Sequence, residues 1–170
     1  MPHGSLRRHP QCLQDNVLYV DPGFHTGLFM WLNVKTGSYL CDTLTYPRDK
    51  KSCIINTLSP FWKGFNEALL DYSPIVVVIE DVFLRPGDPK SMGSALRGDL
   101  LTLDKLAAGY MAAAVHQDIP VRTLRAHQWK GQMDDTAVKA RVRYVCGLNI
   151  DSSHIADACG MSLHEMGIFA

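Results

Sequence analysis

The 170-residue sequence has few cysteines, no net charge and no hydrophobic run long enough to cross a membrane. Its five cysteines are an odd number with no CxxC pair and no histidine at zinc spacing, so neither a disulfide framework nor a zinc site is indicated. No repeat or low-complexity tract interrupts it. We therefore expect reduced thiols, an intracellular location and no membrane partner.

The first residues are expected to form a tail. Residues 1–15 carry Arg7 and Arg8 but lack the apolar core of a signal peptide, so we expect a flexible N-terminal tail. Residues 16–170 are expected to form a single domain, because a chain of this length and 46% apolar composition can bury a substantial core.

The neutral total hides an uneven charge distribution. Lys and Arg outnumber Asp and Glu by 7 to 4 in residues 1–63 and by 10 to 6 in residues 85–143. In residues 64–84 and 144–170 there are no basic residues, against 4 and 3 acidic ones. A basic body around an acidic pocket is the arrangement expected of a phosphate-binding, metal-binding protein. Ordinary solvated faces are the alternative explanation.

Apolar runs and turn residues predict an α/β fold: three strands in a meander, then helices alternating with two further strands. The result is a mixed five-stranded sheet with helices on both faces. Strands are predicted at 16–20, 28–34, 38–45, 75–79 and 121–124, and helices at 61–72, 94–116, 136–146 and from 153 onward.

Three acidic residues occupy positions where such a fold can bring them together. Asp21 and Glu80 each close an apolar strand, and Asp157 lies in the last helix, three residues after His154. At 100° per residue, His154 and Asp157 share one side of that helix, and we expect the opposite side to be buried. Two unit charges 4 Å apart repel by about 4 kcal/mol at a dielectric near 20, so clustered carboxylates favour a bound cation. The pattern is typical of a divalent-metal nuclease.

Three motifs resemble those of the RuvC-type Holliday junction resolvases of the RNase H-like superfamily. They are Asp21-Pro-Gly-Phe-His-Thr-Gly27, Val78-Ile-Glu-Asp-Val-Phe83 and His154-Ile-Ala-Asp-Ala158, in the family's order. The resemblance covers the chain from about Val17 onward. It implies an RNase H-like fold and an endonuclease that resolves four-way DNA junctions in recombination and repair. It also implies a homodimer in the cytoplasm of a bacterial cell or phage-infected host.

The resemblance further implies two Mg²⁺ ions per site that hydrolyse a phosphodiester, with Mn²⁺ as a substitute. Asp21 would bridge the two ions, Glu80 and Asp157 would hold one each, and His154 would either ligate an ion or orient the nucleophile. Because imidazole suits Mn²⁺ better than Mg²⁺, we expect Mn²⁺ to support cleavage at least as well. Cleavage with Mg²⁺ but none with Mn²⁺ would count against His154 as a ligand.

Basic and aromatic residues around the motifs are candidate DNA contacts. Phosphate contacts are expected from lysines and arginines, and base stacking from aromatic rings. Phe83 and Trp129 each have an alternative role, as a core residue and a buried anchor respectively. The candidates are Phe83, Arg125, Trp129, Lys130, Lys139, Arg141 and Arg143.

Three other functions share parts of this pattern. A related nuclease acting on other branched DNA or on RNA would share the acidic residues. A non-catalytic junction-binding protein would tolerate Asp21→Asn. A sugar-kinase-like ATPase would need a much longer chain.

The two-fold symmetry of a junction favours a dimer through the helix around residues 100–111, although that helix could equally be buried in the core.

Overall fold

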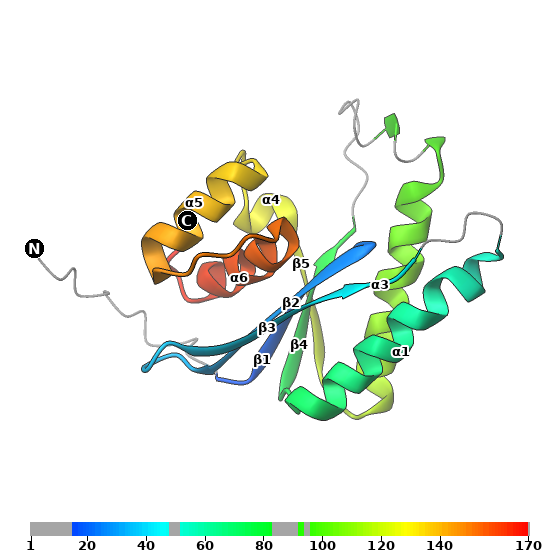
Figure 1. Ribbon diagram of the computed structural model, residues 1–170, viewed down its shortest axis with the longest axis horizontal. Coiled ribbons are helices and arrows are strands. Elements are labelled where there is room, and N and C mark those ends of the chain that lie inside the picture. The colour runs from blue at the N-terminus through cyan, green and yellow to red at the C-terminus, as the bar shows by residue number, and fades with distance from the viewer. Residues whose placement is uncertain (1–14, 48–51, 83–91, 94–95, 170) are drawn as a thin grey trace, which may run out of the picture.

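The computed structural model describes residues 15–47, 52–82, 92–93 and 96–169. It contains one five-stranded sheet in the order β3-β2-β1-β4-β5, with helices on both faces (Figure 1). The predicted mixed sheet is therefore confirmed. The strands are β1 (Val17–Asp21), β2 (His25–Asn33), β3 (Ser38–Thr45), β4 (Val76–Asp81) and β5 (Val121–Arg125). The helices are α1 (Ile54–Tyr72), α3 (Asp99–His116), α4 (Ala126–Trp129), α5 (Asp135–Cys146) and α6 (Ser153–Glu165).

The sheet combines three parallel strands, β1, β4 and β5, with an antiparallel meander of β1, β2 and β3. β1 pairs antiparallel with β2 and parallel with β4, and β4 pairs parallel with β5. The apolar, β-branched run of β4 suits this central place, because both of its faces are covered. The carboxyl ends of β1, β4 and β5 consequently meet at one edge of the sheet.

Side chains of β1 alternate between two hydrophobic cores. Leu18 and Val20 face α1 and α3, whereas Val17 and Tyr19 face α6. The same alternation in β4 directs Val78 toward the α6 side. One step further along each strand, Asp21 and Glu80 continue the α6-facing rows, so both acids are directed to the same side of the sheet.

Helix α1 begins earlier than the predicted residue 61. It starts at Ile54 and contains Pro60, which lacks the N–H needed for one helical hydrogen bond. Leu58 and Phe61 are completely buried in the α1–α3 core, and their burial holds the helix together across the proline. Helix α3 packs beside it. Ser94, where that helix was predicted to begin, lies outside the described residues.

The prediction that α6 buries one side only is wrong. Every residue from Ala156 to Leu163 is buried, because α5 covers the side of α6 that faces away from the sheet. The pattern of apolar and small residues could not distinguish a half-exposed helix from one enclosed on both sides.

None of the helices in the described part of the chain is both long enough and apolar enough to span a bilayer.

Candidate functional site

The three predicted acids and His154 converge where β1, β4 and α6 meet. The parallel register of β1 and β4 sets Asp21 beside Glu80, close enough for the charge of Asp21 to raise the pKa of Glu80. His154, in the first turn of α6, has its Nδ1 atom 2.6 Å from Oδ2 of Asp21. Asp157, one turn further along α6, is close enough to raise the pKa of Asp21 by charge repulsion. The cluster thus joins residues more than 130 positions apart in the chain.

Gly27 allows α6 to reach this position. It pairs with Asp21 across the β1–β2 ladder, and a Cβ atom on it would lie 2.2 Å from the backbone carbonyl carbon of His154. Only a residue without a side chain permits the first turn of α6 to lie directly on the sheet. The second glycine of the predicted motif therefore has a steric role.

A buried hydroxyl network supports the turn after Asp21. The Thr26 hydroxyl donates to the carbonyl of Gly23 at 2.7 Å and lies 2.7 Å from the Tyr110 hydroxyl of α3. Thr26 and Tyr110 are completely buried. Gly23 lies next to His154, since a Cβ on Gly23 would be 3.5 Å from the His154 ring. The network therefore stabilises the turn that contacts His154.

Asp157 is held by a lysine on one oxygen only. The Lys130 ammonium is 2.6 Å from Oδ2 of Asp157 and 3.0 Å from Asp135. Oδ1 of Asp157 is buried without a hydrogen-bond partner among the described residues. A buried carboxylate oxygen without a partner is unfavourable, so this atom is an available ligand position.

The electrostatics of the cluster favour protonation or a bound cation. Burial, aided by the charge of Asp157, raises the pKa of Asp21 from 3.8 to about 7. Burial and then the Asp21 charge raise the pKa of Glu80 well above its ordinary value of 4.5. Burial also raises the pKa of Asp157, although Lys130 opposes the shift. Without a cation, the acids are therefore held in an unfavourable environment near neutral pH.

This environment gives a pH-dependent stability prediction. The folded-state pKa of Asp21 is raised, so its ionisation destabilises the fold above about pH 7, and this penalty shrinks as the pH falls toward the ordinary value of 3.8. A shift of this size corresponds to roughly 4 kcal/mol. Metal-free Asp21→Asn protein is expected to melt about 5 °C or more above the wild type at pH 8, with the difference shrinking toward pH 4. Calorimetry across this pH range, with Asp71→Asn as an exposed control, measures it. Equal melting temperatures at pH 8 would contradict the prediction.

The residues as they stand do not form a preformed metal site. Within the described residues, no group of three or more His, Cys, Asp or Glu side chains is arranged to hold an ion. Asp21 is engaged by His154, and Asp157 by Lys130. Their oxygen donors and the partnerless Oδ1 of Asp157 nevertheless fit a hard divalent cation, once the Lys130 ammonium yields its place.

Among the predicted DNA-contact residues, Lys130 contacts an acid of the cluster, and the other basic ones lie on α5 or at the end of β5. Arg125 pairs with Asp81 at 3.2 Å, Lys139 donates to the carbonyl of Asp151, and the guanidinium of Arg141 lies over the Phe169 ring. Arg143 is exposed on α5. Lys130 lies among the acids instead of on the outer surface. Phe83 lies outside the described residues.

The expectation that Trp129 stacks on bases is corrected. Its side chain is only 3% exposed, so neither ring face is open to a base. Its indole N–H instead donates to Oε1 of Glu80 at 3.2 Å. Trp129 is therefore a buried anchor, which was the alternative interpretation of the sequence. No local sequence pattern linked it to Glu80.

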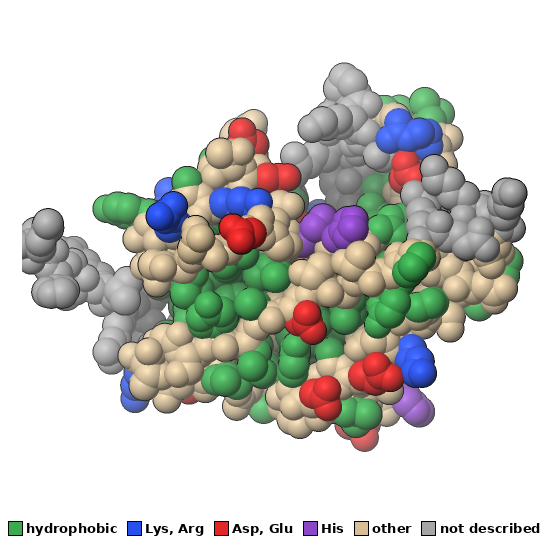
Figure 2. All heavy atoms as spheres, viewed as in Figure 1, with side chains coloured by type: hydrophobic (Ala, Val, Ile, Leu, Met, Phe, Trp, Pro, Cys, Tyr) green, Lys and Arg blue, Asp and Glu red, His purple; other side chains and the backbone are tan. Residues whose placement is uncertain are grey.

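His25 is a further residue near the site that sequence reasoning did not single out. Its ring is stacked near that of His154, with centroids 6.1 Å apart, and its Nδ1 atom lies 3.1 Å from the Thr45 hydroxyl. Histidine side chains are visible at the surface between the two groups of helices (Figure 2). The signal available in the sequence was the position of His25 inside the Asp21–Gly27 motif.

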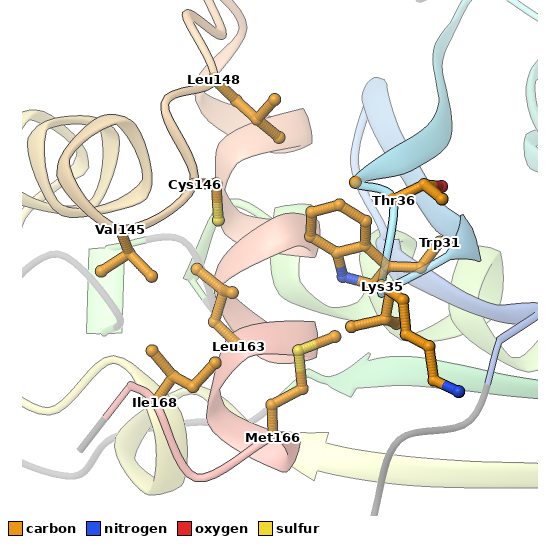
Figure 3. Close-up of a pocket in the computed structure, with 11 residues that line it drawn as sticks. Trp31, Lys35, Thr36, Val145, Cys146, Leu148, Leu163, Met166 and Ile168 are labelled. Carbon is orange, nitrogen blue, oxygen red and sulfur yellow. The ribbon is translucent and has the colours of Figure 1, made fainter. Parts of the chain in front are cut away.

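A separate pocket of about 300 Å³ lies between the β2–β3 hairpin and the ends of α5 and α6 (Figure 3). Trp31, Cys146, Leu163 and Met166 contribute to its mostly apolar lining, and none of the four clustered residues does. The pocket is therefore distinct from the candidate site.

Comparison with solved structures identifies the fold. A Thermus thermophilus RuvC solved "in complex with Holliday junction substrate" superposes with a TM-score of 0.67 over 91% of this chain and 98% of that chain, at 21% sequence identity. The chain has the RuvC fold. A second Thermus thermophilus RuvC structure gives a TM-score of 0.56 at 21% identity, covering 89% of this chain and 96% of that chain.

The similarity to RuvC lies in the three-dimensional structure. No protein-family model and no curated protein matches the chain. The RuvC structures are nevertheless covered almost completely, so the likeness extends over nearly the whole of each chain and not over an isolated motif. The fold predicted from the three motifs is thereby confirmed.

Proposed function

We propose that this protein is a structure-specific DNA endonuclease that resolves four-way junctions by metal-dependent phosphodiester hydrolysis. The observation that carries the proposal is the convergence of Asp21, Glu80, His154 and Asp157 in a half-buried cluster at the carboxyl edge of the sheet. The RuvC fold supports the same conclusion, since one protein with that fold was solved with a junction.

Asp21, Glu80 and Asp157 are the residues that would hold divalent cations, with His154 beside them. When bound, such cations lower the pKa of an attacking water and stabilise the leaving oxygen. The raised pKa values of Asp21 and Glu80 and the partnerless oxygen of Asp157 support this assignment, because each is relieved by nearby positive charge. Mg²⁺ is the expected ion, and Mn²⁺ the substitute.

His154 is placed to orient the nucleophile of the proposed reaction. Its Nδ1 atom is engaged by Asp21, which fixes the plane of the ring, and its side chain is 37% exposed. The remaining Nε2 atom is therefore available to a water, an ion or a phosphate at the surface of the site.

Basic residues near the cluster are proposed to bind the DNA backbone. Arg125 ends β5, beside the end of β4 that carries Glu80, and α5, which packs against α6, carries Lys139, Arg141 and Arg143. Phosphate contacts of this kind position a duplex without reading its sequence. Lys130 is proposed to contact the phosphate nearest the acids once a cation replaces it at Asp157. Phe83 remains a candidate for stacking on a base.

A homodimer is proposed because a four-way junction has two-fold symmetry and each chain supplies one site. Leu101 and Val115 are 58% and 63% exposed, and with Ala108 and Ala112 they form a stripe on the outward side of α3. Light scattering after gel filtration is expected to give twice the chain mass of 18.9 kDa. Leu101→Glu should shift the mass toward the monomer, whereas a wild-type monomer that still makes paired nicks would refute the dimer.

The proposal is tested by offering the metal-loaded protein four end-labelled substrates: a four-way junction, a flap, a linear duplex and an RNA–DNA hybrid. We expect paired, symmetric nicks in the junction and little cleavage of the duplex. Preferential cleavage of the flap or the hybrid would assign the same site to the alternative, another branched DNA or RNA. Binding of the junction without any cleavage would favour a non-catalytic junction-binding protein.

A further inference from the structure

The short helix α4 and the residue after it contact two of the clustered acids. Trp129, the last residue of α4, donates its indole N–H to Glu80 at 3.2 Å. Lys130, the next residue, contacts Asp157 at 2.6 Å. β5 leads directly into α4, and because β5 pairs with β4, α4 begins beside the end of β4 that carries Glu80. Two consecutive residues thus hold acids from two different elements.

We propose that Trp129 is a positioning residue that fixes the carboxyl group of Glu80 for cation binding. The inference rests on the proposed nuclease function and goes beyond it, because it assigns a specific role to a residue that is buried behind the site. An indole N–H is a donor only and carries no charge, so it does not compete with a cation for Glu80. It contacts a single oxygen of Glu80, the Oε1 atom.

The surroundings of Trp129 make the indole a rigid donor. A Cβ atom on Gly160 of α6 would lie 2.6 Å from its ring, so the absence of a side chain there creates the space that the ring fills. The Phe169 ring lies on it at a centroid distance of 6.1 Å and a tilt of 39°. With a side chain only 3% exposed, the ring has little freedom to turn. The glutamate side chain, which has three rotatable bonds, is consequently the partner whose orientation is set.

Lys130 and Trp129 differ in whether their contacts with the acids can remain when a cation binds. The Lys130 ammonium occupies a place near Asp157 where a cation could bind, and it must yield when a cation arrives. The Trp129 contact with Glu80 need not break, because it uses a single oxygen of the carboxyl group. Groups that orient metal ligands in this way typically change metal affinity or activity by about 10- to 100-fold when they are removed.

Trp129→Phe tests the role because it removes the N–H while keeping most of the ring. The matched control is Trp62→Phe, which removes an indole N–H that donates to the Leu106 carbonyl between α1 and α3. Trp129→Phe is expected to raise the Mn²⁺ concentration for half-maximal junction cleavage about 10- to 100-fold. Junction affinity in EDTA should stay at the wild-type value, and Trp62→Phe should leave the Mn²⁺ dependence unchanged.

A readout without DNA or turnover accompanies the kinetics. Mn²⁺ quenches nearby indole emission, so titrating it into the full chain should quench Trp129. The chain has three tryptophans, so the variant Trp31→Phe/Trp62→Phe retains Trp129 alone. We expect saturable quenching in this variant and in the wild type, and its loss in Trp129→Phe.

An unchanged Mn²⁺ dependence in a folded Trp129→Phe protein would overturn the proposal. So would the same change in Trp62→Phe, or the absence of quenching when Trp129 is the only tryptophan. Should Trp129→Phe fail to fold, the quenching result in the Trp31→Phe/Trp62→Phe variant decides the question. Should the wild type cleave no substrate, the proposed nuclease function fails, and the quenching titration still decides whether Trp129 reports on a cation at Glu80.

Discussion

Replacing Asp21 with asparagine is expected to abolish junction cleavage while leaving junction binding intact. Asp21 lies at the centre of the cluster, beside Glu80 on the neighbouring strand, and its Oδ2 atom is 2.6 Å from Nδ1 of His154. Asparagine keeps the shape but removes the negative charge that a shared cation would require. Loss of several kcal/mol of transition-state stabilisation corresponds to a decrease in kcat of about 1,000-fold or more.

The measurement is single-turnover cleavage of a labelled junction, with binding followed separately by gel shift in Ca²⁺. Asp71→Asn, a change at an exposed carboxylate at the end of α1, is the matched control and should cleave like the wild type. Binding should survive in Asp21→Asn because the proposed phosphate contacts come from other residues. Cleavage by Asp21→Asn at a rate near that of the control would remove Asp21 from the catalytic site.

Gly27→Ala is expected to cause a second large loss, although Gly27 bears no chemical group. Its added Cβ would lie 2.2 Å from the His154 carbonyl carbon and 2.6 Å from the Ile155 nitrogen. Both contacts are with backbone, so the first turn of α6 must move by about 1 Å or more. A displacement of this size at a catalytic group can lower the rate about 100-fold. His154 and Asp157 would move together, because both belong to α6.

Gly23→Ala is the matched comparison for Gly27→Ala, since both glycines belong to the same motif. A Cβ on Gly23 would lie 3.5 Å from the His154 ring, an ordinary contact, and the Gly23 backbone does not have a positive φ. Cleavage rates and melting temperatures of both variants should be compared. We expect Gly27→Ala to lose far more activity than Gly23→Ala. Equal rates would show that the close approach of α6 to β2 is unimportant.

The sequence predicted the parts of the fold that depend on local pattern. The apolar, β-branched runs before Asp21 and Glu80 are long enough to identify buried strands, and a two-residue period then directs both acids to one face. The same reasoning failed for α6, because a helix buried on both sides needs small residues as well as apolar ones. Ala156, Ala158 and Gly160 are such residues, and their meaning depends on what packs against them.

Contacts made only in three dimensions could not be predicted. Trp129 and Glu80 are 49 residues apart, and no spacing rule connects an indole after β5 with a carboxylate at the end of β4. The hydrogen bond between Thr26 and Tyr110 joins residues 84 positions apart. The early start of α1 was missed because Pro60 normally opposes an uninterrupted helix, and only the burial of the surrounding side chains offsets that preference.

If Asp21, Glu80 and Asp157 act together in cutting DNA, the nicks made in a synthetic four-way junction will depend on Glu80. All four strands are labelled in turn and incubated with Mg²⁺ or Mn²⁺ and either the wild type or Glu80→Gln. We predict symmetric nicks in two opposing strands with the wild type, and none with a Glu80→Gln protein that binds the junction equally well. The same nicks at the same rate with Glu80→Gln would show that Glu80 takes no part in cleavage.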